Sequence, residues 1–113
     1  MKIVGVSACT VGIAHTYLAQ QKMEDAAKKL GDEIKIETQG TIGIENKLSA
    51  NDIKEADIVI LAIDVKISGE ERFENKKKVK VSTETAIKSP NKLIAKLHEI
   101  AGKQILNGKA RGG

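Results

Sequence analysis

Two short, mainly apolar runs limit the folds open to this 113-residue chain. They span residues 3–8 and 58–63, and neither alternates apolar with polar positions. A strand has such a continuous apolar sequence when helices cover both faces of its sheet, as in a parallel α/β sheet. Residues 33–38 and 78–82 do alternate, which is typical of strands at the edge of a sheet. The pattern therefore predicts two central and two edge strands.

Helical spacing of apolar residues lies between and after these strands. The predicted helices span residues 16–30, 50–56, 83–88 and 90–105. Gly31 ends the first helix and Ser49 caps the second. Ser89 followed by Pro90 is a strong start for the last helix, whose apolar stripe runs to Ile105.

This alternation predicts an α/β three-layer sandwich with a four-stranded parallel sheet in the order 2-1-3-4, flanked by helices. The direction of the connections reverses between the first and third strands. Ligands of open α/β sheets bind at the carboxyl ends of strands beside such a reversal. Cys9 follows the first strand and Asp64 follows the third, so the single cysteine of the chain lies where this fold places chemistry.

Composition and charge narrow the class of protein. We expect residues 1–105 to form one domain and residues 106–113 to be a flexible tail. A lone cysteine cannot form an internal disulfide, and no apolar run approaches the roughly 20 residues that span a bilayer, so we expect a cytoplasmic protein. Residues 76–113 carry ten basic and two acidic side chains. Their lysines either form a solvated face or steer an acidic partner, whereas the scarcity of aromatic residues argues against nucleic acid.

The segment from Cys9 to Thr16 joins the first strand to the first helix. Such a loop turns backbone N–H groups toward an anion, and the positive end of the helix adds to the attraction. A thiolate beside this cradle suits attack on phosphorus, or storage of a phosphoryl group as phosphocysteine. His15 is a candidate phosphoryl stabiliser or a partly buried helix residue. Gln39 and Gly40, after the second strand, complete the cradle or form an ordinary turn.

Other functions stay open on the residues alone. Cysteine-dependent tyrosine phosphatases use Cys-x5-Arg, whereas His15 occupies the arginine position here and the loop has no arginine. The loop is therefore better suited to passing on a phosphoryl group than to hydrolysing it. The alternatives are a small cysteine-dependent phosphatase and a non-catalytic regulatory module with Cys9 in the core. Arg72 is a weak candidate for a further charge near the site.

Four segments together resemble the fructose-type IIB components of the bacterial phosphoenolpyruvate-dependent sugar phosphotransferase system. They are residues 9–16, 37–43, 56–57 and 71–73, in matching order and spacing. The resemblance implies a small α/β domain that accepts a phosphoryl group on Cys9 from a phosphohistidine of the IIA component, and nothing in the sequence demands more than a monomer. It then passes that group to a sugar bound by the membrane IIC component, at the inner face of the membrane. This activity is that of a protein-phosphocysteine–sugar phosphotransferase.

The resemblance also assigns the remaining site residues, and it implies neither a metal nor a cofactor. Backbone amides hold the phosphoryl oxygens in the loop formed by Thr10, Val11, Gly12, Ile13, Ala14 and Thr16. The family usually has Cys-Pro-Thr-Gly at the start of this loop, whereas this chain has Thr10 and Val11 at the second and third positions. The lost proline frees an amide and removes some rigidity, and the sugar stays open among fructose, a mannose derivative and another hexose.

Overall fold

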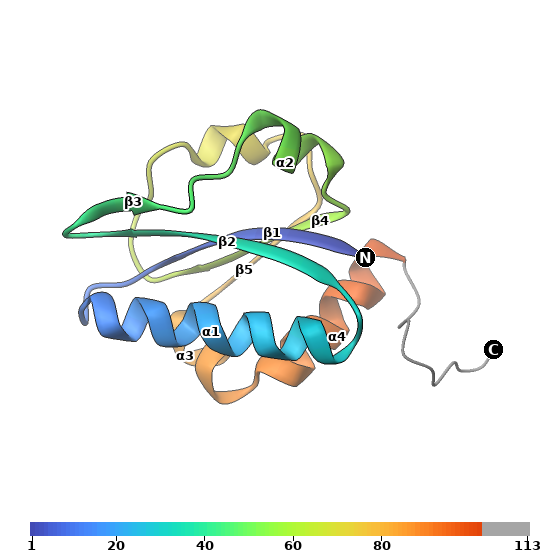
Figure 1. Ribbon diagram of the computed structural model, residues 1–113, viewed down its shortest axis with the longest axis horizontal. Helices are drawn as coiled ribbons and strands as arrows, with labels where there is room; N and C mark the ends of the chain where they lie inside the picture. Colours follow the sequence, from blue (N-terminus) through green and yellow to red (C-terminus); the bar gives the residue numbers. More distant parts are fainter. Residues whose placement is uncertain (103–113) are drawn as a thin grey trace.

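A computed structural model describes residues 1–102, in which helices cover both faces of a central sheet (Figure 1). The strands are β1 (Lys2–Ala8), β2 (Glu33–Gly40), β3 (Gly43–Glu45), β4 (Ile58–Ile63) and β5 (Lys78–Val81). The helices are α1 (Ile13–Lys29), α2 (Ala50–Glu55), the 3-10 helix η1 (Glu70–Phe73), α3 (Thr83–Lys88) and α4 (Pro90–Ala101). The three-layer α/β sandwich that the sequence predicts is confirmed. Within these residues, no helix has the length and apolar character needed to cross a bilayer.

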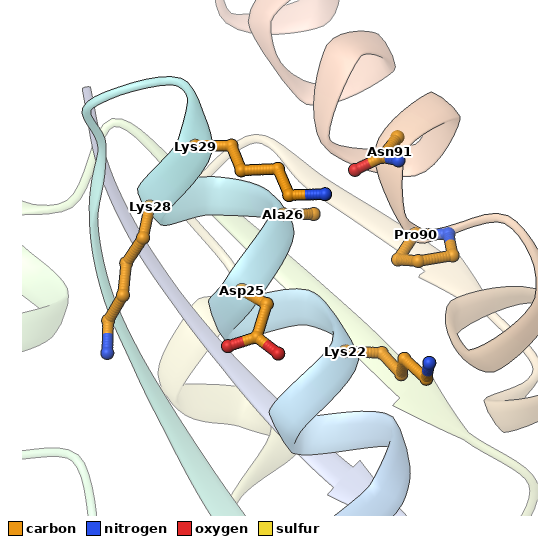
Figure 2. Close-up of a pocket in the computed structure, with 7 residues that line it drawn as sticks. All are labelled: Lys22, Asp25, Ala26, Lys28, Lys29, Pro90 and Asn91. Carbon is orange, nitrogen blue, oxygen red and sulfur yellow. The ribbon is translucent and has the colours of Figure 1, made fainter.

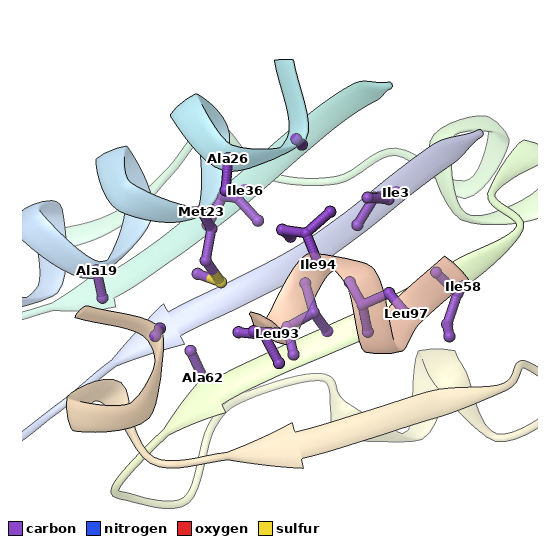
Figure 3. Close-up of a cluster of buried hydrophobic side chains, with 13 residues drawn as sticks. Ile3, Ala19, Met23, Ala26, Ile36, Ile58, Ala62, Leu93, Ile94 and Leu97 are labelled. Carbon is purple, nitrogen blue, oxygen red and sulfur yellow. The ribbon is translucent and has the colours of Figure 1, made fainter. Parts of the chain in front are cut away.

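The central strands bury both of their faces, as their apolar sequences predict. Every residue of β4 is buried, and so are the last six residues of β1. Ile3, Ile58 and Ile60 face α1, α3 and α4, where they form one core cluster with residues such as Met23 (Figure 3). Alternate residues of both strands face the other layer and pack against α2 and against Phe73 of η1. Each strand thus contributes to two cores.

The prediction of four strands was wrong in number, because the sheet has five in the order β3-β2-β1-β4-β5. The extra strand β3 turns back and pairs antiparallel with the end of β2, from Thr38 opposite Glu45 to Gly40 opposite Gly43. Gly43 has a φ of 107°, which permits this sharp return and which side-chain-bearing residues rarely adopt. Three residues are too few to show an alternating pattern in the sequence. The four parallel strands keep the predicted order, as β2-β1-β4-β5.

The caps of the helices agree with the sequence in most respects. Ser49 and Asp52 form a capping box at the start of α2, and each side chain accepts a hydrogen bond from the other's backbone N–H. Pro90 is the first residue of α4, although the Ser89 side chain makes no capping hydrogen bond. Gly31 has a φ of 78° directly after α1 and its C-cap. The short helix η1 was not predicted, and the proposed tail at residues 106–113 lies outside the described residues.

The most prominent difference among the helices is at the start of α1. This helix begins at Ile13, three residues before the predicted start at Thr16, and Gly12 is its N-cap. Apolar periodicity finds the buried stripe of a helix, and in the first turn of α1 only Thr16 is buried, so the pattern missed the three residues before it. The earlier start places His15 and Thr16 in the first helical turn, next to Cys9.

We expect Gly5→Ala to destabilise the protein severely. Gly5 lies in the middle of β1, between Ile36 of β2 and Ile60 of β4. A Cβ atom at Gly5 would stand 2.3 Å from the Ile60 carbonyl oxygen and 2.5 Å from its Cγ2 atom. Backbone cannot move away as a side chain can, so we expect a loss of about 3 kcal/mol in the free energy of unfolding.

Chemical denaturation of the Gly5→Ala variant measures this loss, with Gly40→Ala as the matched control. An added Cβ at Gly40 meets the terminal Cδ1 atom of Ile13 at 2.5 Å, and that methyl group can rotate away. The control should therefore lose much less stability. Equal losses in both variants would show that the close approach of β1 to β4 does not restrict position 5 to glycine.

Candidate functional site

Cys9 lies at the carboxyl edge of the sheet, where the first and third parallel strands end side by side. Ala8 pairs with Ile63, and the Asp64 backbone N–H donates to the Ala8 carbonyl at 2.9 Å. This is the position beside the reversal of connections that the sequence predicts for a ligand. The Cys9 side chain is half-buried and carries a free thiol. The thiol contacts the first turn of α1, with Sγ 3.2 Å from the Thr16 Oγ1 atom.

The loop after Cys9 has the features of an anion cradle. The Thr16 N–H donates to the Gly12 carbonyl at 3.2 Å, so the N–H groups of the preceding helical residues have no helical acceptor. No acidic residue lies in this first turn, which leaves the positive end of α1 uncompensated. Gly12 has a φ of 151° and an extended ψ, a conformation that favours glycine. The Ser7 hydroxyl donates to the Thr16 carbonyl at 2.8 Å and ties the helix start to β1.

His15 is held by two residues to which the sequence analysis gave no role. Its Nε2 atom lies 3.0 Å from the Thr83 hydroxyl, and that hydroxyl donates to Asp64 Oδ2 at 2.5 Å. The Thr83 backbone N–H donates to Asp64 Oδ1 at 3.0 Å. Because the hydroxyl has one proton and gives it to Asp64, its oxygen accepts from His15 Nε2–H. Thr83 is fully buried and Asp64 is exposed.

The ligand atoms of Cys9, His15 and Asp64 all lie within 4.8 Å of one another. Thr83 is the first residue of α3, and only the N-cap residue Ser82 separates it from the end of β5. It therefore reaches the same edge of the sheet as the other three residues. Its position after a predicted parallel strand is the signal that could have indicated it. The distance of Thr83 along the chain from Cys9 hides the contact, which only the sheet order creates.

The two candidate residues at the end of β2, Gln39 and Gly40, make different contacts. Gly40 lies against Ile13, since a Cβ on Gly40 would stand 2.5 Å from the Ile13 Cδ1 atom. The Gln39 side chain instead bonds both backbone groups of Ser68, accepting from its N–H at 2.9 Å and donating to its carbonyl at 3.0 Å. Gly40 is thus beside the start of α1, and the Gln39 amide links β2 to the segment before η1.

Arg72 is committed to a buried carboxylate. Its guanidinium donates to both oxygens of Glu37, at 2.9 and 3.0 Å, and lies 4.8 Å from the centre of the Phe73 ring. Glu37 has no exposed surface, and it also accepts from the Leu48 backbone N–H at 2.9 Å. Burial raises the pKa of Glu37, but the hydrogen bonds from Arg72, Gln39 and Leu48 outweigh it and hold the pKa below its usual value. Two segments that the sequence analysis singled out separately, residues 37–43 and 71–73, thus meet in one ion pair.

Exposed apolar side chains surround the Cys9 end of the molecule. They are Val11, Tyr17, Leu18, Ile42 and Ile44, which we call the apolar rim. Val11 is 72% exposed and Ile42 is 63% exposed. The Tyr17 hydroxyl donates to Glu45, which holds the start of α1 against the β2–β3 hairpin. Among the described residues, one other large apolar side chain is exposed, Ile100 in the last turn of α4.

The lysine run at residues 76–78 lies away from Cys9, whereas Lys66 and Lys80 line the hollow beside Asp64. Lys78 pairs with Val59 at the amino end of the parallel strands, opposite to the edge that carries Cys9. Lys76 donates to the carbonyls of Lys54 and Ala56, both at 2.9 Å. Steering of a partner onto Cys9 by these lysines therefore has no geometric support. A groove between α1 and α4 also holds lysines (Figure 2). Its lining residues are Lys22, Asp25, Ala26, Lys28, Lys29, Pro90 and Asn91, none of which the sequence predicts for the site.

Comparison with known proteins gives consistent results. The family described as "PTS system, Lactose/Cellobiose specific IIB subunit" matches residues 4–96. The "PTS system fructose-like EIIB component 2" of Escherichia coli (strain K12) is 48% identical over 96 residues, which cover 85% of this chain and 91% of that protein. Component 1 of the same strain is 41% identical over 99 residues, which cover 88% and 92% of the two chains.

Solved structures share the fold. A domain of the fructose-specific IIABC component from Borrelia burgdorferi is 50% identical, with a TM-score of 0.81 and coverage of 92% of this chain and 96% of that one. The Enzyme IIB subunit of the PTS system from Escherichia coli K12 is 40% identical, with a TM-score of 0.84 and coverage of 89% and 94%.

We expect Arg72→Met to destabilise the fold, because it leaves the Glu37 carboxylate buried without its cation. Removing one partner of a buried ion pair costs about 3–5 kcal/mol. The Arg72 side chain keeps 21% of its surface exposed, so we expect the lower end of that range. Chemical denaturation at neutral pH measures the loss. Lys88→Met, which removes the partner of exposed Glu84, should change stability little. A loss no greater than that of the control would contradict a structural role for the pair.

The same ion pair predicts sensitivity to acid. Folding lowers the pKa of Glu37, so its stabilisation is complete above the usual value of 4.5 and is lost as the pH falls through the lower value of the folded state. Denaturation midpoints measured from neutral pH to about pH 3 should decline less steeply for Glu37→Gln than for the unmodified protein. Identical slopes would show that other carboxylates cause the acid sensitivity.

Proposed function

Because this chain belongs to the IIB components of the bacterial sugar phosphotransferase system, a family of phosphotransferase domains, we propose that Cys9 carries its phosphoryl group. IIB components work together with IIA and IIC components. The donor is then a phosphohistidine of IIA, and the acceptor is a sugar bound by the membrane IIC component. The relatives named fructose-like favour fructose or a similar hexose as the sugar. The observation that carries the proposal is the Cys9 thiol at the uncompensated amino end of α1.

The transfer takes place in two displacements at phosphorus. The Cys9 thiolate attacks the phosphohistidine, so that the S–P bond forms as the P–N bond breaks and the imidazole of IIA leaves. A sugar hydroxyl then attacks the phosphocysteine, so that the O–P bond forms as the S–P bond breaks. The hydroxyl proton passes to a base on the acceptor side, and the thiolate is regenerated. Both steps need alignment and charge stabilisation more than covalent chemistry from the protein.

The loop of residues 10–16 supplies that stabilisation in the proposal. Its backbone N–H groups hold the equatorial oxygens of the phosphoryl group, and the amino end of α1 adds a favourable field. Thr10, where the family usually has proline, contributes one more N–H group. The Thr16 hydroxyl, 3.2 Å from Sγ, is placed to contact the sulfur as its charge changes.

His15 stabilises the phosphoryl group from a fixed position. Its Nε2 atom is bonded to Thr83, so Nδ1 is the ring atom left to face a phosphoryl oxygen. Thr83 and Asp64 act as positioning residues, because they set the orientation of this ring beside Cys9.

The apolar rim is the surface on which IIA and IIC dock in turn, at the inner face of the membrane. A phosphothiol ester is reactive toward water, so a partner has to exclude water during transfer. The apolar rim is suited to this, because contact with a partner buries these side chains together with the loop. A small phosphatase would need a guanidinium group in the loop to hold the phosphoryl oxygens, and the loop has no arginine. Arg72 cannot take this part, because its guanidinium is bound to Glu37.

We expect the unmodified protein to gain one phosphoryl group and Cys9→Ser to gain none. Each is incubated with phosphoenolpyruvate, the general phosphotransferase proteins and a fructose-type IIA protein, and then analysed by intact-protein mass spectrometry. His15→Ala serves as the second variant and should gain the group more slowly. A gain that persists in Cys9→Ser and disappears in His15→Ala would place the phosphoryl group on His15. Sustained turnover of p-nitrophenyl phosphate without a partner would instead indicate a phosphatase.

Replacing two apolar rim residues should weaken docking without changing the chemistry. We expect Ile42→Ser combined with Ile44→Ser to raise the KM for phosphorylated IIA and to leave kcat near its original value. Ile100→Ser is the matched control, because Ile100 is also an exposed apolar residue but lies in the last turn of α4. Equal effects of the rim and control substitutions would show that IIA docks elsewhere.

A further inference from the structure

The residues around Cys9 form a cluster of three different metal-binding groups. A thiol, an imidazole and a carboxylate come from Cys9, His15 and Asp64, with their ligand atoms within 4.8 Å of one another. They belong to the loop after β1, the first turn of α1 and the residue after β4. We propose that these three residues bind a zinc ion, and that the bound ion blocks phosphoryl transfer. The family resemblance implied no metal here.

The donor set and its spacing suit zinc. Zn²⁺ takes Cys sulfur, His nitrogen and Asp oxygen as ligands, and three protein ligands with one water are common in its open sites. A tetrahedral ion with these bond lengths holds its ligand atoms roughly 3.3–3.6 Å apart. The longest separation here therefore has to shorten by about 1 Å. Rotation of the half-buried Cys9 and exposed Asp64 side chains can provide this movement.

Thr83 orients two of the ligands before any ion arrives. Its hydroxyl contacts the His15 ring, and its hydroxyl and N–H both donate to Asp64. Zinc sites commonly have such outer partners, which fix the histidine tautomer and orient the carboxylate. The Thr83 side chain is fully buried, so its own position is determined by packing.

The charges of the cluster also favour a cation. A divalent ion neutralises both the Asp64 carboxylate and the thiolate that Cys9 becomes on binding it. The basic residues that line the hollow beside Asp64 are Lys66 and Lys80. Lys80 already pairs with Glu70 at 3.3 Å, and Lys66 is exposed. A cation can therefore approach the cluster from the solvent.

Zinc and a phosphoryl group compete for the same sulfur lone pair. On binding, the Cys9 thiol releases its proton to solvent as the S–Zn bond forms, and no oxidant or reductant takes part. While that bond exists, the sulfur cannot attack phosphorus. The binding of zinc is independent of the proposed function, whereas the block of transfer rests on it.

Cobalt(II) is the probe for the site, because it takes the same ligands and a thiolate–cobalt bond gives a charge-transfer band in the near ultraviolet. We expect titration of the unmodified protein with Co²⁺ to produce this band and Zn²⁺ to abolish it. Cys9→Ser should show no band. Asp64→Asn and His15→Ala should each bind at least tenfold more weakly, and Thr83→Val about tenfold more weakly. Asp25→Asn, which changes an exposed aspartate on α1, is the matched control and should bind as the unmodified protein does.

Two results would overturn the site. One is the absence of a band in the unmodified protein, and the other is an unchanged affinity in both Asp64→Asn and His15→Ala, which would mean that the thiol binds the ion alone. Circular dichroism of each variant confirms that it is folded. Phosphorylation by IIA with and without Zn²⁺ then tests the block separately. A cobalt band together with unimpaired phosphoryl transfer in the presence of Zn²⁺ would overturn the block of transfer and keep the metal site. A cobalt band in a protein that never gains a phosphoryl group would contradict only the proposed function.

Discussion

The close approach of β1 to β4 is the constraint on which the rest of the structure depends. Gly5 permits it, because a side chain there would collide with the backbone of Ile60. The approach aligns the carboxyl ends of the two strands, so that Cys9 and Asp64 follow neighbouring residues. It also lets each strand contribute to a separate core on each face of the sheet. The scaffold and the site thus arise from the same pairing.

A buried ion pair then attaches the outer layer to this scaffold. Glu37 and Arg72 join β2 to η1, and the Gln39 amide adds hydrogen bonds to the backbone of Ser68. Burying a carboxylate is costly unless hydrogen bonds satisfy it, and Glu37 accepts them from Arg72, Gln39 and Leu48. Arg72, which the sequence analysis considered as a further charge near the site, therefore holds two segments together. The site relies on backbone amides instead.

The chemistry of Cys9 follows from its surroundings more than from the residue itself. The amino end of α1 and the loop amides suit an oxyanion, whereas the Asp64–Thr83–His15 chain offers oriented donors to a cation. These two ligands need different neighbours of the same sulfur atom. In the two proposals, the loop amides hold the phosphoryl group, Asp64 holds the metal ion, and His15 contacts either ligand. If both proposals hold, one thiol serves as the phosphoryl carrier and as the point of inhibition.

The parallel sheet, the order of its four parallel strands and the place of Cys9 could all be predicted from the sequence. Those features depend on apolar runs, helical spacing and the rule that ligands bind beside a reversal of connections, all of which are local or topological. The sequence did not reveal β3, the early start of α1, or the roles of Thr83, Asp64 and Arg72. The strand β3 is too short and the first turn of α1 too little buried to leave a pattern, whereas the roles of Thr83, Asp64 and Arg72 depend on contacts between residues far apart in the chain. Hydrogen-bond partners across a sheet edge leave no pattern in the sequence, whereas burial on two faces leaves a continuous apolar run.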